Sequence, residues 1–336
     1  MLKLGTDLLA FIGKECKGKT HIKLTVGTLA DGEQTIQTFG ASGEVPNENY
    51  VYEIGSITKT FTASLLAKYI HEGKMSLDDS IAKYVDGLGD SYYPTLKRLA
   101  THTAGYGFLP ATIREGISML LLARFLGSRN KGIMPNALKV DEGKMKQLLL
   151  ENKKEDKNYP WAYSNFGIGL LGYAVGRASG KGYAATMDAF LANELQMPSS
   201  YTGTKPDINL HGYDKKNRDI GNWDFEKTIM ASAGDISATA ADMLTYAKKH
   251  MNNELPYLTL THQKHTVARK GMSNAGLAWI LMGENNQIIV HNGGTGAFDS
   301  LLIIDKNKKL AYVVLSNYLI NTNKLFTTVL DEIKKR

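Results

Sequence analysis

The pattern of apolar and polar positions changes twice along the chain. Near the start, apolar and polar residues alternate with a period of two on either side of the polar stretch 30–33, as in a β-hairpin. The middle of the chain repeats its apolar residues at helical spacing, and alternation returns towards the end. We expect strands at 21–28, 34–40, 277–281, 287–290, 300–304 and 310–315, and helices at 3–15, 56–67, 168–177, 237–251 and 323–336.

This order of elements predicts an α/β fold, in which an antiparallel sheet built from N- and C-terminal strands is flanked by helices and joined to a mostly helical middle region. Residues 1–48 and 270–336 would form the sheet subdomain, and residues 49–269 the helical subdomain, with the functional site at their junction. Residues 106–159 are irregular because prolines and glycines interrupt the helical pattern. They fit either a cap over the site or an insertion that packs on the helical half.

Composition narrows the class of protein. A hydrophobic content of 43% and a charged content of 22% are those of a globular chain of 336 residues. The net charge of +7 comes mostly from scattered lysines, which indicate a solvated surface rather than a nucleic-acid site and favour an anionic substrate or an anionic cell surface. No apolar run is long enough to predict a membrane span. Residues 1–15 do not have the pattern of a secretory leader, so we expect a cytoplasmic protein, or an extracytoplasmic one whose leader has been removed.

The sequence gives little support for a metal site or a disulfide. Cys16 is the only cysteine, which excludes a disulfide within the chain and a cysteine-based metal site. His262 and His265 lack a nearby carboxylate pattern, and no His-Glu-x-x-His occurs. We therefore expect no metal and no cofactor.

The strongest candidate for catalytic chemistry is the stretch 53–67. Its apolar spacing places Ser56 in the first turn of a buried helix, with Lys59 one turn further on the same face. A serine hydroxyl needs a neighbour that takes its proton, and burial lowers the pKa of a lysine towards that role. Free backbone N–H groups of a first helical turn would also favour negative charge there. The pair is a candidate nucleophile and base.

The Ser-x-x-Lys pattern is weak evidence when it stands alone. Ser80-x-x-Lys83 follows an acidic stretch typical of a surface helix, and Ser128-x-x-Lys131 lies among glycine, arginine and asparagine. Neither of these buries its lysine. For Ser56 and Lys59, an ordinary helix-start serine with a lysine reaching to solvent is as plausible as a catalytic pair from this context alone.

Two further segments offer polar groups that could complete a site. Tyr163 could share or relay the serine proton, and Asn165 could hydrogen-bond a substrate amide, although a satisfied buried tyrosine and a turn asparagine are the ordinary alternatives. Between two late strands, the run His291-Asn292-Gly293-Gly294 would let the backbone approach a ligand closely. Such glycines and a satisfied structural histidine are also common for purely geometric reasons.

The three motifs taken together, in the order Ser56-x-x-Lys59, Tyr163-x-Asn165 and His291-x-Gly293, resemble those of the serine β-lactamase and penicillin-binding-protein superfamily. The likeness spans roughly residues 20–320. Within the superfamily the chain looks most like the branch that contains class C β-lactamases, D-alanyl-D-alanine carboxypeptidases and esterases. The resemblance implies a single β-lactamase-like catalytic domain that carries an acyl-enzyme.

The resemblance also implies a role for each residue. Ser56 would be the acylated nucleophile, and Lys59 and Tyr163 would share the base and acid roles. The substrate would be bound by Asn165, His291, Asn292 and Gly293, and the N–H groups of Ser56 and Gly294 would form the oxyanion hole. His102, in a loop near this site, is expected to be a structural histidine that bonds backbone.

One motif departs from the family pattern. Class C β-lactamases usually carry Lys-Thr-Gly where this chain has His291-Asn292-Gly293, so a permanent cation is replaced by a group that is only partly charged at neutral pH. We expect weak β-lactamase activity at most, and hydrolysis of D-amino-acid peptides or amides such as peptidoglycan fragments. The alternatives are a carboxylesterase acting on small acyl esters and a non-catalytic penicillin-binding or assembly module. No Gly-x-Ser-x-Gly occurs, which excludes the nucleophile elbow of α/β-hydrolases.

Overall fold

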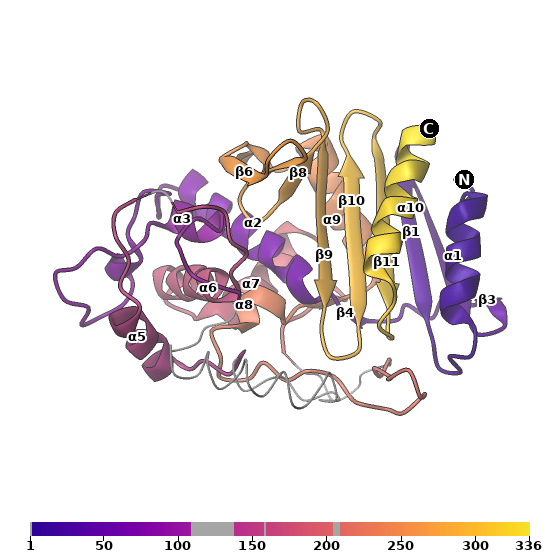
Figure 1. Ribbon diagram of the computed structural model, residues 1–336, viewed down its shortest axis with the longest axis horizontal. Coiled ribbons are helices and arrows are strands. Elements are labelled where there is room, and N and C mark those ends of the chain that lie inside the picture. Colours follow the sequence, from indigo (N-terminus) through magenta and orange to yellow (C-terminus); the bar gives the residue numbers. More distant parts are fainter. Residues whose placement is uncertain (1, 109–137, 158, 204–208) are drawn as a thin grey trace.

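The computed structural model describes residues 2–108, 138–157, 159–203 and 209–336. In this part of the chain a nine-stranded antiparallel sheet has the order β3-β2-β1-β11-β10-β9-β8-β7-β6 (Figure 1). Its strands are β1 (Leu24–Ala30), β2 (Glu33–Gly40), β3 (Gly43–Val45), β6 (Thr266–Arg269), β7 (Ser273–Ala275), β8 (Ile280–Met282), β9 (Ile288–Gly294), β10 (Asp299–Asp305) and β11 (Leu310–Ser316). Two short strands, β4 (Tyr52–Glu53) and β5 (Ser237–Ala238), pair separately.

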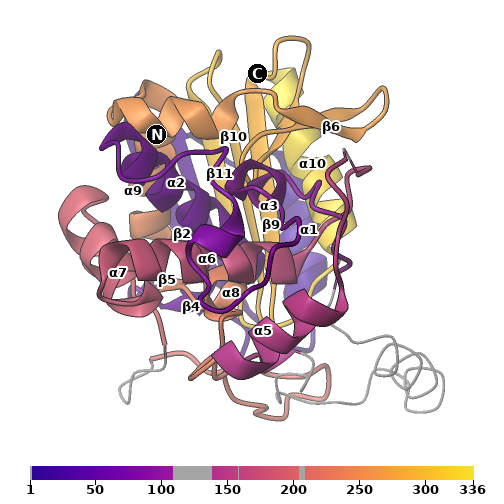
Figure 2. The ribbon, with the colours of Figure 1, turned by 90° about the vertical axis from the view of Figure 1, so that its left-hand side faces the viewer.

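The helices gather on the sheet faces and on the side of the molecule that Figure 2 turns to the viewer. The described helices are α1 (Thr6–Cys16), α2 (Thr58–His71), α3 (Leu96–Ala100), α5 (Glu142–Glu151), α6 (Asn165–Ser179), α7 (Tyr183–Ala189), α8 (Ala231–Gly234), α9 (Ala240–Asn252) and α10 (Thr322–Lys335). None of them is long and apolar enough to cross a membrane.

The first and last parts of the chain share the sheet. Strand β1 pairs with β11 along its whole length, from Leu24 opposite Ser316 to Ala30 opposite Leu310. Helices α1 and α10 pack on one face and on each other, and α9 packs on β1 and β11 from the other face (Figure 1). All residues of β10 and β11 are buried because both faces are covered. The predicted fold class is confirmed, and the division into subdomains at residues 48 and 270 stays a prediction.

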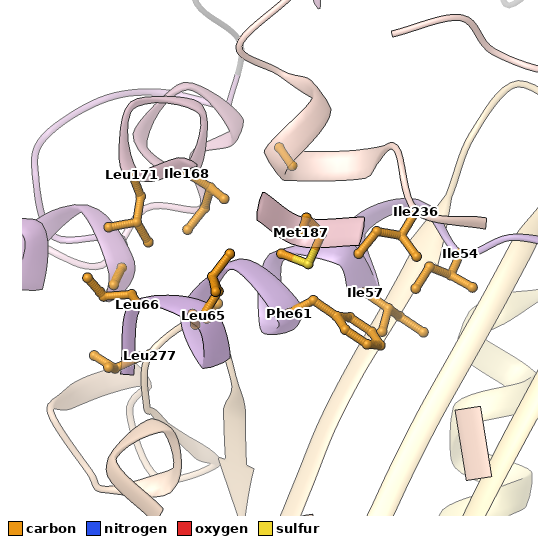
Figure 3. Close-up of a cluster of buried hydrophobic side chains, with 14 of the residues drawn as sticks. Ile54, Ile57, Phe61, Leu65, Leu66, Ile168, Leu171, Met187, Ile236 and Leu277 are labelled. Carbon is orange, nitrogen blue, oxygen red and sulfur yellow. The ribbon is translucent and has the colours of Figure 1, made fainter. Parts of the chain in front are cut away.

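Helix α2 runs through the main hydrophobic core. Every residue from Thr58 to Ala67 is buried, including the threonines and Ser64. The aliphatic and aromatic side chains of α2 meet apolar residues from several other segments (Figure 3). The hydroxyls are satisfied locally: Thr60 Oγ1 donates to the Ile57 carbonyl and Ser64 Oγ to the Thr60 carbonyl. A helix buried on all sides is held rigidly, which matters because it begins next to Ser56.

Several local predictions differ from the structure, among them the helix expected at 237–251, which begins at Ala240 after the short strand β5. The strand expected at 277–281 begins only at Ile280, because Ala278 has a left-handed φ of 57° and the Gly276 N–H donates to the Trp279 carbonyl, which closes a turn. Those residues are apolar because they are buried, not because they form a strand. The run 291–294, expected as a turn, continues β9. Ser80 caps a short 3-10 turn by accepting from the Ala82 N–H, where a surface helix was expected.

The irregular region 106–159 is only partly described. Residues 109–137, with the Ser128-x-x-Lys131 pattern, lie outside the described residues, so the choice between a cap and an insertion stays open. Beyond them, α5 begins at Glu142, and the Asp141 side chain caps it by accepting from the Lys144 N–H.

Candidate active site

Ser56 lies in a 3-10 turn, Gly55–Ile57, that leads directly into α2. It therefore precedes the α-helix by one short turn rather than opening it. Gly55 has a φ of 50°, a left-handed conformation that a residue with a Cβ rarely adopts. This turn carries the chain sharply from β4 into α2, so that Ser56 lies at the start of the most deeply buried helix.

Lys59 lies against Ser56 as the sequence predicts. Its Nζ donates a hydrogen bond to Ser56 Oγ at 2.9 Å and another to the Ala233 carbonyl oxygen at 2.6 Å. The side chain has no exposed surface, and burial lowers the pKa of Lys59 well below its ordinary value. No carboxylate in the described part of the chain forms an ion pair with it. A neutral amine beside a serine hydroxyl can take its proton.

Tyr163 is brought to the same place by the loop that precedes α6. The Ser164 side chain caps α6 by accepting from the Gly167 N–H, which fixes where this loop ends. Lys59 Nζ lies 5.0 Å from the centre of the Tyr163 ring. Burial raises the pKa of the Tyr163 phenol, while its interaction with the Ser56 side chain acts in the opposite direction. The phenol therefore faces both members of the serine–lysine pair as a neutral proton carrier.

His291 lies in β9 with its ring centre 6.2 Å from that of Tyr163. Its Nδ1 is 2.6 Å from the Asn292 carbonyl oxygen, so in the neutral ring Nδ1 carries the proton and donates it there. Burial, followed by the charge of Lys59, lowers the pKa of His291 to about 3. The imidazole is therefore neutral near pH 7, and it places no permanent cation at this position.

Asn165 and Asn292 contribute differently. Asn165 is the first residue of α6 and is 8% exposed, and among the described residues nothing hydrogen-bonds to its side-chain amide. The amide is available to a ligand. The Asn292 side chain is exposed, whereas its carbonyl holds His291.

The end of β9 touches the Ser56 turn so closely that only glycine fits on either side. A Cβ added at Gly293 would lie 2.0 Å from the Ile54 carbonyl oxygen and 2.9 Å from the Ser56 nitrogen. One added at Gly55 would lie 2.7 Å from the Gly294 nitrogen. The peptide units of Ser56 and Gly294 thus lie beside each other, as an oxyanion hole requires.

Two features of this arrangement could not be found from side-chain patterns. The Ala233 carbonyl that accepts from Lys59 belongs to α8, and a backbone group has no sequence signature. Phe108 is 60% exposed and stacks on Tyr163 with ring centres 5.8 Å apart. The backbone hydrogen bond expected of His102 is present, because its Nδ1 accepts from the N–H of Ser164.

Two further features of the described residues bear on where a site could lie. No group of three or more His, Cys, Asp or Glu side chains in this part could hold a metal ion. A cavity of about 840 Å³ opens beside α8, lined by residues of α6, α7 and the segment 224–231, and it contains none of the predicted site residues.

Comparisons with known proteins agree on one family. The beta-lactamase family model matches residues 24–327. A beta-lactamase of Providencia stuartii is 23% identical over 240 residues, which cover 68% of this chain and 56% of that protein. The D-alanyl-D-alanine-carboxypeptidase/endopeptidase AmpH of Escherichia coli K12 is 26% identical over 333 residues, 89% of this chain and 80% of that protein. The crystal structure of a class C beta lactamase has the same fold, with a TM-score of 0.79 at 21% identity over 98% of this chain and 97% of that one.

Proposed function

The chain belongs to the beta-lactamase family, and from this membership we propose that it is a serine hydrolase acting through an acyl-enzyme on Ser56. The observation that carries the proposal is the 2.9 Å hydrogen bond between Lys59 Nζ and Ser56 Oγ. Lys59 has no exposed surface and pairs with no carboxylate among the described residues, and its lowered pKa favours the amine, which is the form that activates a hydroxyl.

In the proposed acylation step, Ser56 Oγ attacks the substrate carbonyl carbon while its proton passes to the Lys59 amine, directly or through the Tyr163 hydroxyl. The N–H groups of Ser56 and Gly294 stabilise the oxyanion. The intermediate then expels the amine or alcohol, which takes up the proton from the same pair. Water attacks the acyl-enzyme along the reverse proton route, which releases the acid and restores the Ser56 hydroxyl.

We propose D-amino-acid peptides or amides, such as peptidoglycan fragments, as the substrates. Two observations support this class: the free amide of Asn165 at the start of α6, and the similarity over 89% of the chain to a protein described as a D-alanyl-D-alanine-carboxypeptidase/endopeptidase. Asn165 would hold the substrate amide, and His291 would orient the substrate by accepting from one of its N–H groups at Nε2. Because His291 is neutral and its Nδ1 proton is donated to the Asn292 carbonyl, its Nε2 can only accept a hydrogen bond, so the ring offers a substrate carboxylate neither an ion pair nor a donor, which keeps β-lactamase activity low.

The same neutral His291 favours a second candidate, a carboxylesterase on small acyl esters. An ester substrate without a carboxylate needs no cation in the site. The two functions make different predictions for the binding residues. If the substrate is a D-peptide, Asn165→Ala and His291→Ala each reduce amide hydrolysis far more than ester hydrolysis. Equal losses on both substrates would support the esterase.

The nucleophile is tested by intact-protein mass spectrometry after exposure to a fluorophosphonate and, separately, to a penicillin. We expect an adduct on the wild-type protein and none on Ser56→Ala. Ser80→Ala is the matched control, because Ser80 begins another Ser-x-x-Lys run but caps a 3-10 turn with Lys83 at the surface. It should be labelled like the wild type.

The outcomes separate the candidate functions. Ser56-dependent adducts with both reagents, together with D-peptide turnover, would support the peptidase. A fluorophosphonate adduct with neither penicillin adduct nor penicillin turnover would favour the esterase. A stable penicillin adduct without turnover of any substrate would indicate a non-catalytic binding module, and no adduct with either reagent would contradict the enzyme.

A further inference from the structure

His102 has an unusual backbone conformation for a histidine beside the proposed site. It follows the turn that ends α3 and has a left-handed φ of 58°. This conformation is unfavourable for a residue with a Cβ and persists only where the surroundings fix it. The contacts of His102 show that the segment before α6 holds it there.

His102 bonds the chain on both sides of Tyr163. The Ala162 N–H donates to the His102 carbonyl oxygen at 2.9 Å, and the Ser164 N–H donates to His102 Nδ1 at 3.2 Å. The two peptide groups that flank Tyr163 are therefore tied to one residue of a different loop. An extended segment held at two such points has little freedom to turn its middle side chain away.

The imidazole also packs against the phenol. The ring centres of His102 and Tyr163 are 4.8 Å apart, and Trp161 meets the His102 ring edge-on at 5.8 Å. His102 is 4% exposed, so its ring fills the space behind Tyr163 rather than facing solvent. The position of the phenol is fixed by this contact as well as by the two hydrogen bonds.

The hydrogen bond from Ser164 settles which tautomer is present. Because Nδ1 accepts, the proton lies on Nε2, and Nε2 is buried without a partner among the described residues. Burial, followed by the charges of Lys59 and His291, lowers the pKa of His102 to about 3, so the ring does not ionise at working pH. His102 therefore acts through geometry and not through its own proton transfer.

We propose that His102 is a positioning residue that holds the Tyr163 hydroxyl in place over the Ser56–Lys59 pair. The proposal rests on the proposed function, because Tyr163 matters only if Ser56 is acylated. If it is correct, replacing His102 slows the reaction of Ser56 only because Tyr163 is displaced. The same replacement should then have little effect in a variant that already lacks the Tyr163 hydroxyl.

A double-mutant cycle tests this claim through the rate at which a fluorophosphonate labels Ser56. We expect His102→Ala to slow labelling about 10- to 100-fold in the wild-type background and less than about 2-fold in Tyr163→Phe. His102→Asn should recover most of the rate, since asparagine tolerates a positive φ and its Oδ1 can accept the Ser164 N–H. If the fold-losses in labelling rate of His102→Ala and Tyr163→Phe multiply in the double variant, the two residues act independently and the proposal is overturned.

Two further measurements separate this proposal from a simple loss of folding and from a failure of the proposed function. His262→Asn removes another buried histidine, hydrogen-bonded to His250 and outside the proposed site, and should leave labelling of the folded protein unchanged. Hydrogen exchange at the Ser164 amide needs no activity. It should speed up in His102→Ala and return towards the wild-type rate in His102→Asn. Unchanged exchange in His102→Ala would overturn the proposal, whereas accelerated exchange in a protein with no Ser56 labelling would contradict only the proposed function.

Discussion

The proposed chemistry of the Ser56 turn depends on Lys59, which pairs with no carboxylate among the described residues. Lys59, His102 and His291 are all buried, and burial disfavours the charged form of each. If any two were protonated, they would also repel each other. The arrangement therefore favours three neutral basic groups around Tyr163, and a proton taken from Ser56 introduces the first charge. This arrangement supports the proposed transfer of the Ser56 proton to a neutral base.

Asp235 shows the opposite effect of burial, on acidic groups. Burial raises the pKa of the Asp235 carboxyl to about 8, and that of Glu53 on the neighbouring strand β4 to about 7. Between about pH 4 and these raised values, each carboxyl keeps its proton in the folded protein but has lost it in the unfolded chain. Their contribution to the free energy of unfolding is therefore fully present below about pH 4. It is lost as the pH rises towards 7 for Glu53 and towards 8 for Asp235.

We expect Asp235→Asn to make the free energy of unfolding less dependent on pH. The difference between pH 5 and pH 8 should shrink by roughly 2–4 kcal/mol, because the amide cannot ionise yet its oxygen can still accept the Gly203 N–H. Urea unfolding at the two pH values measures this. Asp78→Asn, at an exposed carboxylate, is the control and should leave the difference unchanged. An unaltered pH dependence in Asp235→Asn would show that another group is responsible.

The sequence predicted the side chains of the proposed site better than it predicted the backbone groups that hold them in place. Ser56 and Lys59 are three positions apart where the 3-10 turn passes into α2, so local geometry alone brings them together. The Ala233 carbonyl and the bond from Ser164 to His102 join segments more than sixty positions apart. Backbone groups carry no residue-type signal, so these contacts could be seen only in the folded chain.

At the scale of elements, the proposed site depends on how the end of β9 meets the turn before α2. The Ser300 hydroxyl of β10 donates to the Ile54 carbonyl at 2.8 Å, which draws the turn onto the sheet. Gly293 lies at the closest point, where the Ser56 and Ile54 backbones leave no room for a side chain. The sheet and α2 therefore set the relative position of the two proposed oxyanion donors.

Gly293→Ala tests this contact. The new methyl would lie 2.0 Å from the Ile54 carbonyl oxygen, which is backbone, so β9 or the Ser56 turn has to move. We expect Ser56 labelling to fall at least about 100-fold, the loss typical of one missing oxyanion donor. Gly13→Ala, on the exposed side of α1 with nothing within 4 Å, should label normally and gain about 0.5–1 kcal/mol of stability. Normal labelling of Gly293→Ala would contradict the assignment of Gly294 to the oxyanion hole.

The same contact explains why sequence misplaced residues 291–294. Paired glycines between strands usually indicate a turn, because glycine adopts positive φ. Here neither Gly293 nor Gly294 has a positive φ, and both continue β9 opposite β10. They are glycines because another backbone comes close, and nothing in a single chain distinguishes that need from the need for a turn.

At the scale of the whole molecule, segments from the two ends of the chain are joined in one open sheet. Strand β1 lies between β2 and β11, and α1 packs on α10. The Glu332 side chain of α10 joins these parts, because it accepts from the Gly5 N–H at 2.8 Å and from the Tyr312 hydroxyl at 2.9 Å. The period-two alternation at both ends predicted this shared sheet, whereas the strand order followed from no local pattern.

This interleaving predicts that the proposed site and the far side of the sheet unfold together. Leu325→Ala removes a fully buried side chain of α10 and should cost about 2–5 kcal/mol. If the chain unfolds as one unit, the temperature at which Ser56 labelling is lost should fall by the same amount as the midpoint from circular dichroism. Thr327→Ala, on the exposed face of the same helix, should move neither. Labelling that survives the melting of the sheet would instead show that α2 and its neighbours form an independent folding unit, because the nucleophile turn would then keep its geometry without β9 and β10.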